Sequence, residues 1–314
     1  MPATIVPSAR WRWILPKAFK IPAIHFSPQE TPKVGLNKAL VGKEYPANSY
    51  AITAEECKKY ALGYNEDLPL FFDETLPGGI LAPPMFGVKY AGLSIAQAFF
   101  DPEFGVDFAR MVHGEQDMEF LGPVRPGDLI TTVGRIASVE EKSTGEIFVV
   151  ETRSENQKGS PVLRCLATFF IRGKQSGSGK KEPEEIPERR YAFTQSMKVR
   201  EDQTYRYAEG SGDHNPIHVD PAFAKQVGLP GIILQGLCTM AFCFKAVQDN
   251  ACGRDPLRVK RLRVRFAKPV LPLDTVTTRA WVEQSGTDAT VFGFDGVNQR
   301  GELVIRNGLA HVAV

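Results

Sequence analysis

The stretch Tyr207–Met240, YAEGSGDHNPIHVDPAFAKQVGLPGIILQGLCTM, organises the expected fold and chemistry of this 314-residue chain. Asp213, Asn215 and His218 lie within six residues of one another, and the glycines and proline among them disfavour regular helix. We therefore expect a loop that carries polar side chains. Asp-x-Asn-Pro is also a common turn sequence, so taken alone this loop leaves a catalytic role and a simple turn both open.

Two helices are predicted after this loop. Asp220 followed by proline is typical of a helix N-cap, and Gly228 is typical of a C′ residue, so residues 221–227 should form a short helix. The almost wholly apolar run after Gly236 indicates a helix buried at the centre of a domain. The first turn of a helix leaves backbone N–H groups free, so the Gly236 N–H could stabilise a developing negative charge.

A metal site is an alternative interpretation of the same loop. His214 and His218 are four residues apart, with two aspartates nearby. Pro216 lies between the histidines, and no cysteine or third histidine follows at ligand spacing. Zinc sites usually show their further ligands more openly, so we expect no metal here.

The composition narrows the class of protein. Hydrophobic residues make up 43% of the chain, enough for two sizeable cores, and the net charge of +2 gives no reason to expect a nucleic-acid partner. No uninterrupted apolar run reaches the roughly 20 residues that a membrane span needs. The five cysteines show no CxxC spacing, and their odd number favours a reducing, intracellular compartment.

Residues 1–40 differ from the rest of the chain. They are basic, contain no acidic residue before Glu30 and include several prolines. A mitochondrial presequence shares the basic character, but sparse serine and the prolines fit an amphipathic helix poorly, so a targeting segment and an N-terminal arm packed on the body both remain open. We expect a cytoplasmic or mitochondrial location; the C-terminal residues His311–Val314 are not a Ser-Lys-Leu signal, which leaves the peroxisome open without favouring it.

From Val41 onward the chain repeats itself. The matching blocks are Tyr60–Gly63 with Tyr207–Gly210, Phe120–Thr131 with Phe266–Thr277, and Asn156–Arg164 with Asn298–Arg306. Because the blocks keep their order and nearly constant offsets, the sequence predicts a tandem duplication. Its units are residues 41–172 and 191–314, joined by a Gly-, Ser- and Pro-rich linker at residues 173–190.

Each unit has the same predicted order of elements. A capped helix, beginning near Thr53 or near Glu201, precedes the loop, the buried helix and several strands. The expected strands are residues 116–120, 129–139, 147–154 and 162–171, then 261–267, 275–284, 290–297 and 303–313. One apolar helix followed by an antiparallel meander implies a sheet wrapped round that helix, so the fold class is α+β, with the unit present twice.

The two units differ where chemistry is expected. In place of Asp213, His218 and Gly236, the first unit has Glu66, Phe71 and Pro83. Proline has no N–H to offer a negatively charged oxygen. The first unit has therefore lost the acid/base pair and the donor together, which indicates that the three residues act as a set in the second unit.

Several motifs carry a resemblance to a known family. They are Ser211–Asp213, Asn215–His218, Gly236–Thr239, Arg265–Val270 and, in the first unit, His113–Gln116. Together they resemble the MaoC-type 2-enoyl-CoA hydratase 2 family, as in the double-hotdog hydratase unit of peroxisomal multifunctional enzymes. The resemblance implies a tandem double hotdog fold, a CoA thioester substrate without a further cofactor, Asp213 and His218 as the acid/base pair, and Gly236 in the oxyanion hole. Gln235 stands where the family usually has histidine, which bears on substrate range.

Hydration of a trans-2-enoyl thioester needs a water at C3, a proton at C2 and stabilisation of an enolate oxygen. Asp213 and His218 can hold one water and relay its proton, while the Gly236 N–H binds the oxygen. Asn215 either orients one of the pair or forms the turn. The expected function is a (3R)-specific trans-2-enoyl-CoA hydratase, which in reverse is a 3-hydroxyacyl-CoA dehydratase; the alternatives are a hotdog acyl-CoA thioesterase and a non-catalytic acyl-CoA binding protein.

Substrate-binding residues are expected outside the loop. Met85 and Phe86, at the helix start of the first unit, either leave room for an acyl chain or simply pack the core. Arg265 and Lys268 either bind the CoA phosphates or belong to a solvated strand face. We interpret His113 as structural. A homodimer is a conceivable assembly, although the fused units could already complete the pair.

Overall fold

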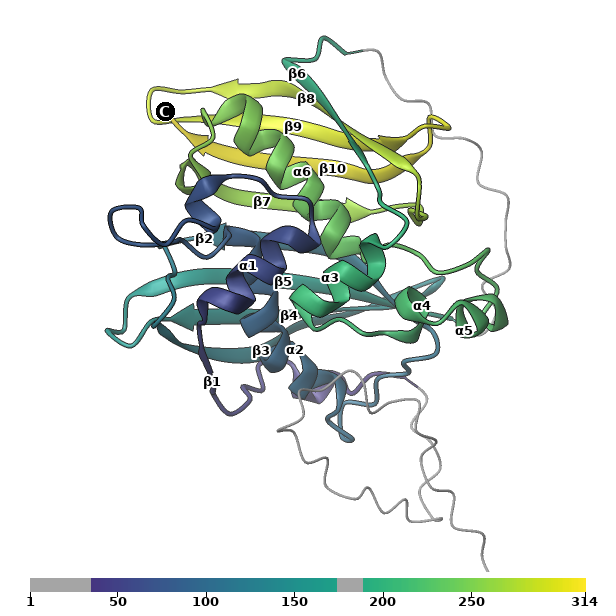
Figure 1. The fold of residues 1–314 in the computed structure, drawn as a ribbon. Coiled ribbons are helices and arrows are strands. Elements are labelled where there is room, and N and C mark those ends of the chain that lie inside the picture. Colours follow the sequence, from purple (N-terminus) through teal and green to yellow (C-terminus); the bar gives the residue numbers. More distant parts are fainter. Residues whose placement is uncertain (1–34, 174–188) are drawn as a thin grey trace, which may run out of the picture.

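The computed structural model describes residues 35–173 and 189–314, which build one ten-stranded antiparallel sheet with the longer helices lying across it (Figure 1). Most of the predicted linker 173–190 and most of the N-terminal segment 1–40 lie outside these residues. Leu36, near the start of the described chain, is buried in the core of the first half. Among the described helices, none is long and apolar enough to cross a membrane.

The two halves contain corresponding elements. The first half comprises η2 (Lys38–Leu40), β1 (Asn48–Ala51), α1 (Ala54–Gly63), η3 (Pro69–Phe71), η4 (Pro84–Phe86), α2 (Gly87–Phe99), β2 (Met111–Phe120), β3 (Leu129–Lys142), β4 (Gly145–Glu155) and β5 (Pro161–Arg172). The second comprises β6 (Phe193–Lys198), α3 (Gln203–Ser211), α4 (Pro216–Val219), α5 (Pro221–Gln226), α6 (Gly236–Ala251), η5 (Pro256–Arg258), β7 (Val259–Phe266), β8 (Thr275–Ser285), β9 (Ala289–Asn298) and β10 (Leu303–Ala313).

The order of strands in the sheet is symmetric about its centre. It runs β1-β3-β4-β5-β2-β7-β10-β9-β8-β6, so β2 of the first half pairs with β7 of the second. Asp117 lies opposite Arg263 in this pairing, and the two occupy the same place in their respective units. The halves are therefore related by a pseudo-two-fold axis near this pair. The predicted α+β double unit and its tandem duplication are confirmed.

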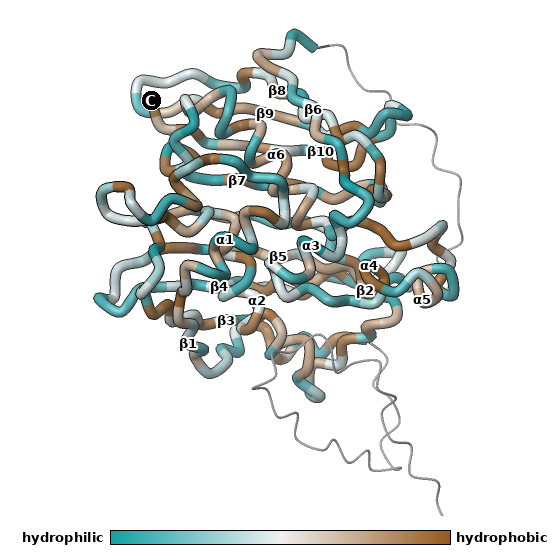
Figure 2. Tube along the Cα trace, in the orientation of Figure 1, coloured by the Kyte–Doolittle hydropathy of each residue, from teal (hydrophilic) through white to brown (hydrophobic). Residues whose placement is uncertain are grey.

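The predicted strands are all present and are mostly longer than predicted. Alternation of buried and half-buried residues makes them recognisable in the sequence. Figure 2 shows hydrophobic and hydrophilic residues interspersed along the chain. Two edge strands, β1 and β6, were not predicted because they are short and polar. The expectation of a loop throughout residues 213–218 was wrong, since α4 makes one helical turn that includes His218.

The central helix of the second half is buried on every side. In α6 every residue from Cys238 to Gln248 is buried, and the helix packs against β7, β8 and β10. Buried apolar side chains of both halves form one large cluster, and a second, smaller cluster lies within the first half. The five cysteines are all buried, and none of them forms a disulfide.

The N-terminal helices α1 and α3 cross at two glycines and tie the halves together. A Cβ on Gly63 would lie 3.2 Å from Cα of Tyr207, and one on Gly210 would lie 2.8 Å from Cα of Tyr60. The hydroxyls of the two tyrosines are 3.0 Å apart. The repeated Tyr-Ala-x-Gly block therefore exists because the backbones of the two helices approach too closely for any larger residue.

Candidate active site

Three hydrogen bonds fasten the polar segment to the residues that precede α6. The Ile233 N–H donates to the Ile217 carbonyl over 3.1 Å, and the Ile233 carbonyl lies 2.7 Å from Nδ1 of His218. Nε2 of Gln235 donates to the Asp213 carbonyl over 3.3 Å. Because α6 begins directly after Gln235, these bonds hold the acid and the imidazole beside the start of that helix.

Asn215 shapes the segment in two ways. Its side-chain Oδ1 accepts from the Ile217 N–H over 3.3 Å and so caps α4, whose first residue is Pro216. Its backbone N–H donates to Oδ1 of Asp213 over 3.2 Å. The side chain of Asn215 therefore forms the turn, whereas its contact with the acid is made by the backbone N–H, which any residue except proline could supply. The cap also fixes the turn of helix from which His218 points inward, where the residue is buried.

The protonation of the His218 ring follows from its partner. A carbonyl oxygen can only accept, so the 2.7 Å contact with Ile233 requires the hydrogen on Nδ1. In the neutral imidazole Nε2 is then an acceptor. It lies 3.7 Å from Oδ2 of Asp213, and the side chains are 9% and 39% exposed respectively.

This arrangement suits a water molecule. When the His218 ring is neutral, its Nε2 and a carboxylate oxygen of Asp213 are both acceptors, so they cannot hydrogen-bond to each other. A water that donates one hydrogen to each satisfies both and keeps a lone pair of its oxygen free. The pair can therefore hold a nucleophilic water and accept its proton.

Gly236 is the first residue of α6 and provides a free donor. Within residues 35–173 and 189–314, no acceptor is bonded to its N–H. A Cβ at this position would lie 3.1 Å from the Phe266 ring, so glycine allows the helix start to approach that ring. A free N–H at the start of a buried helix is suited to a developing oxyanion.

Gln235, the residue before Gly236, hydrogen-bonds to the backbone around the site. It is fully buried, and its Nε2 donates to the carbonyls of Thr204 and Asp213 over 3.0 and 3.3 Å. Its Oε1 is buried without a partner. The amide thus supplies the donor that links the helix start to the acid.

Glu66, the counterpart of Asp213 in the first half, is hydrogen-bonded to the second half. Glu66 is buried, and its Oε1 accepts from Nζ of Lys245 over 3.1 Å. Its Oε2 accepts from Nε2 of Gln248, also over 3.1 Å. Both partners lie on α6 of the other half. Glu66 therefore joins the halves and has no group available for proton transfer.

The counterparts of His218 and Gly236 are equally unsuited to chemistry. Phe71 lies on η3, the equivalent of α4, and is fully buried. Pro83 precedes η4 and has no N–H. Asp213, His218 and Gly236 are the set that the structure keeps together, and the first half has no equivalent of it.

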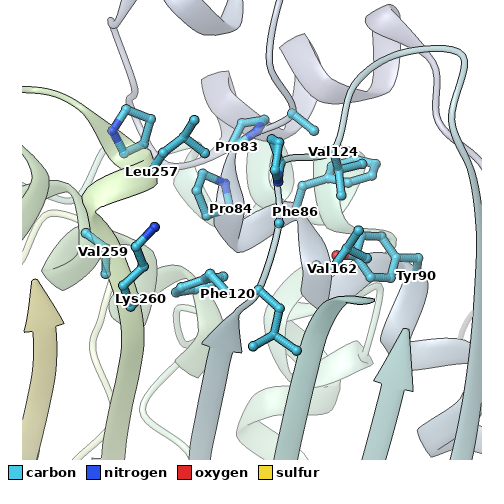
Figure 3. A pocket seen from close by; sticks show the side chains of 16 residues that line it. Pro83, Pro84, Phe86, Tyr90, Phe120, Val124, Val162, Leu257, Val259 and Lys260 are labelled. Atoms are coloured by element: carbon cyan, nitrogen blue, oxygen red, sulfur yellow. The ribbon is translucent and has the colours of Figure 1, made fainter. Parts of the chain in front are cut away.

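The first half has a cavity at the matching helix start. It measures about 140 Å³ and is lined mainly by apolar residues of that half, with Pro256, Leu257, Val259 and Lys260 of the second half closing one side (Figure 3). Phe86, expected in an acyl-chain pocket, lines it. Met85 is fully buried and is not among the lining residues. The cavity thus marks the pseudo-symmetric counterpart of the candidate site and lies away from Asp213 and His218.

The basic residues expected to bind CoA are exposed but paired. Arg265 lies 3.5 Å from Glu115, and Lys268 lies 2.7 Å from Glu302, with the two basic side chains 47% and 60% exposed. Arg265 lies on β7 next to Phe266, and Lys268 comes two residues after that strand ends; the Phe266 ring packs on the helix start of the candidate site. They remain accessible to an anionic ligand.

His113 was interpreted as structural, and the structure places it near the candidate site. Its ring stacks on Phe169 and meets the edge of Phe266, with centroid separations of 4.6 and 5.0 Å. Burial lowers the pKa of His113 to about 4, and the charge of Asp213 opposes this shift in part. Sequence analysis missed this proximity, although His113 belongs to one of the motifs that carried the family resemblance.

The histidines considered as metal ligands have separate partners. His214 faces Glu209 at 4.0 Å, whereas His218 faces Asp213. Within the part of the chain that the structure describes, no three or more His, Cys, Asp or Glu side chains are grouped so that they could hold a metal ion.

Two family models match the chain, one in each half. The model of the MaoC like domain matches residues 182–293, and the model of the FAS1-like dehydratase domain region matches residues 39–165. The second-half match contains Asp213, His218 and Gly236.

Relatives of known name match over most of the chain. The probable enoyl-CoA hydratase 2 of Dictyostelium discoideum is 30% identical over 284 residues, covering 87% of this chain and 95% of that protein. The peroxisomal enoyl-CoA hydratase 2 of Arabidopsis thaliana is 29% identical over 268 residues, covering 78% and 86%. The crystal structure of a MaoC-like dehydratase from Phytophthora capsici superposes with a TM-score of 0.74 at 29% identity, covering 88% and 97%. The chain belongs to the MaoC-like dehydratase family.

Proposed function

We propose that this protein is a (3R)-specific trans-2-enoyl-CoA hydratase, which in the reverse direction dehydrates a (3R)-3-hydroxyacyl-CoA. The observation that carries this proposal is the placement of two acceptors, Nε2 of His218 and Oδ2 of Asp213, 3.7 Å apart and beside a helix start with a free N–H. The names of the Dictyostelium and Arabidopsis relatives support it.

The reaction begins with the water between the pair. Its oxygen attacks C3 of the enoyl thioester while one of its protons passes to Nε2 of His218. The Asp213 carboxylate stabilises the imidazolium that forms. The C3–O bond is made as the C2–C3 double bond loses its π electrons toward the thioester carbonyl.

The second stage returns the proton. The Gly236 N–H stabilises the negative charge on the thioester oxygen, which makes C3 electrophilic and lowers the barrier. The proton on Nε2 of His218 is then delivered to C2, which restores the pair. Water is consumed and no electrons enter or leave, so the reaction as proposed requires no cofactor.

We assign Arg265 and Lys268 to the phosphates of CoA. Their partners Glu115 and Glu302 are at the surface, where an ion pair contributes little to stability. A phosphate can therefore replace either carboxylate at a small cost in free energy. Replacing either basic residue by Met should raise KM for the CoA substrate and leave kcat nearly unchanged, whereas a loss in kcat alone would contradict the assignment.

The cavity beside Phe86 is our candidate for the distal part of a long acyl chain. It is apolar and lies in the half that has lost its polar groups. A chain that reaches it would extend from the catalytic half into the first half. This proposal makes the first half a determinant of chain length.

We propose that a single chain is the catalytic unit, because β2 and β7 already join the two halves. The five buried thiols fit a reducing intracellular compartment. The peroxisome, named for the Arabidopsis relative, is one such compartment besides the cytoplasm and mitochondrion.

One assay separates this function from its alternatives. Purified protein is supplied with crotonyl-CoA and with a longer trans-2-enoyl-CoA, and the enoyl absorbance and free thiol are followed together. Loss of absorbance without thiol, with a (3R) product, is the expected result. Release of thiol would indicate a thioesterase instead, and no change in either signal would indicate an acyl-CoA binding protein.

A further inference from the structure

Strand β2 carries an irregularity that redirects one side chain. Its pairing with β5 shifts between His113 and Glu115, so Gly114 is the extra residue of a β-bulge. Beyond the bulge, Gln116 and Met118 are buried on the face that carries the helices. Without the bulge, strand alternation would turn His113 to the opposite face. The extra residue brings it inward, against the aromatic core.

Strand β7 has the same irregularity at the matching place. Its pairing with β10 shifts between residues Arg261 and Val259, so Lys260 is the extra residue. Leu262 is buried on the helix face, and the bulge brings Val259 to that face too. Val259 thus corresponds to His113, as Lys260 corresponds to Gly114.

The cavity of the first half shows where the side chain at this bulge position, Val259, points. Val259 comes from the second half, yet it lines the cavity at the helix start of the first half, with Pro83 and Phe120 (Figure 3). Under the pseudo-two-fold relation, Pro83 and Phe120 correspond to Gly236 and Phe266. His113 should therefore line the equivalent space in the second half, and its 5.0 Å contact with Phe266 agrees with this.

We propose that His113 is a further catalytic residue, whose Nε2–H donates a hydrogen bond to the thioester carbonyl oxygen beside the Gly236 N–H. The inference rests on the proposed hydratase function and adds a second oxyanion donor to it. The donor comes from the first half, so neither half contains the complete site.

The state of the His113 ring suits this role. Its Nε2 is buried and has no hydrogen-bond partner, whereas buried polar atoms in proteins nearly always have one. The substrate oxygen would supply that partner. Because burial lowers the pKa of the ring to about 4, the imidazole is neutral at physiological pH. In the tautomer with its hydrogen on Nε2, the neutral ring donates a hydrogen bond without forming an ion pair with Asp213 and without transferring its proton.

The test compares two ligands that differ only at the carbonyl. Octanoyl-CoA has the thioester oxygen, and its thioether analogue octyl-CoA has a methylene in that place. His113→Phe keeps an aromatic ring against Phe169 and removes the donor, while His113→Gln restores an N–H donor. We expect His113→Phe to bind octanoyl-CoA about 10-fold more weakly and octyl-CoA as the wild type does, with kcat for crotonyl-CoA reduced about 100-fold.

The outcomes separate this inference from its alternatives. His113→Gln should recover part of the octanoyl-CoA affinity, and circular dichroism should show all variants folded. Equal loss of affinity for both ligands, or no loss for either, would overturn the inference. If wild-type protein binds both ligands but does not hydrate crotonyl-CoA, the proposed hydratase function fails instead.

Discussion

The loop that carries Asp213 and the loop that carries Glu66 share one backbone design. Both follow a helix that ends in a left-handed residue, with φ of 81° at Gly212 and 61° at Asn65. Both continue into a short helix whose first residue is proline, Pro216 or Pro69. The turn is therefore common to both halves and does not itself determine what the loop does.

The difference lies in what each carboxylate faces. Glu66 is enclosed by Lys245 and Gln248 of the other half, so its charge stabilises the assembly of the halves. Asp213 is partly exposed and faces the acceptor nitrogen of His218, which leaves it able to hold water. In the proposed mechanism, catalysis therefore depends on a carboxylate that is oriented but not paired with a cation.

After substitutions of the acid/base pair itself, the largest effect is expected from Gly236→Pro, which places the first-half residue at the start of α6. Proline fits the first position of a helix, and Gln235 has the extended conformation that a residue before proline requires. We expect kcat for crotonyl-CoA to fall by about 100- to 1000-fold, because the oxyanion loses its backbone donor.

Gly236→Ala is the matched control for that variant. It adds a Cβ near Phe266 but keeps the N–H. Its kcat should lie well above that of Gly236→Pro. Equal kcat values for the two variants would show that crowding against Phe266 is responsible and that the N–H has no role.

The next largest effect is expected from Glu66→Gln, which removes the negative charge that pairs with Lys245 of the other half. The free energy of unfolding, measured in urea, should fall by about 2–3 kcal/mol because Lys245 loses a buried partner. Asp67 and Asp249 still pair with Lys245 and limit the loss. Turnover by the folded variant should match the wild type, and a large fall in kcat would refute the separation of roles between the loops.

A smaller effect on stability is expected when the pH is lowered. His113 has a folded-state pKa of about 4 against an ordinary 6.5, so the unfolded chain binds a proton that the folded chain does not. Its contribution to stability is fully present above pH 6.5 and is lost as the pH falls toward 4. Between pH 7 and pH 5 the wild type should therefore lose about 2 kcal/mol more than His113→Phe, measured by chemical unfolding. Parallel losses would mean that the ring is not held neutral.

The smallest effect is expected from filling the first-half cavity. Leu257→Trp adds bulk at its lining. If the cavity holds the end of a long acyl chain, kcat/KM for hexadecenoyl-CoA should fall several-fold and that for crotonyl-CoA should not change. An equal effect on both substrates would favour ordinary core packing at Phe86.

Much of the fold was predictable because the information is local. Strand alternation located the strands, and the N-cap Asp220 located the short helix within one residue of its end. The short polar strands β1 and β6 have no such pattern and are strands only because they pair with β3 and β8.

The site was predictable where its residues are close in sequence. Asp213, Asn215 and His218 share one turn, and the repeat itself showed which half had lost them. Contacts between halves could not be foreseen in this way. Glu66 and Lys245 are 179 residues apart, and the position of His113 depends on both the β2–β7 pairing and a bulge at one glycine.

The central claim is that proton transfer belongs to the second half alone. The most direct test measures kcat for crotonyl-CoA hydration in Asp213→Asn and His218→Asn, with Glu66→Gln as the matched first-half variant. We predict a fall of about 1000-fold or more in the first two, with folded structure retained, and wild-type turnover in the third. Normal turnover by Asp213→Asn or His218→Asn, or its loss in Glu66→Gln, would contradict the account.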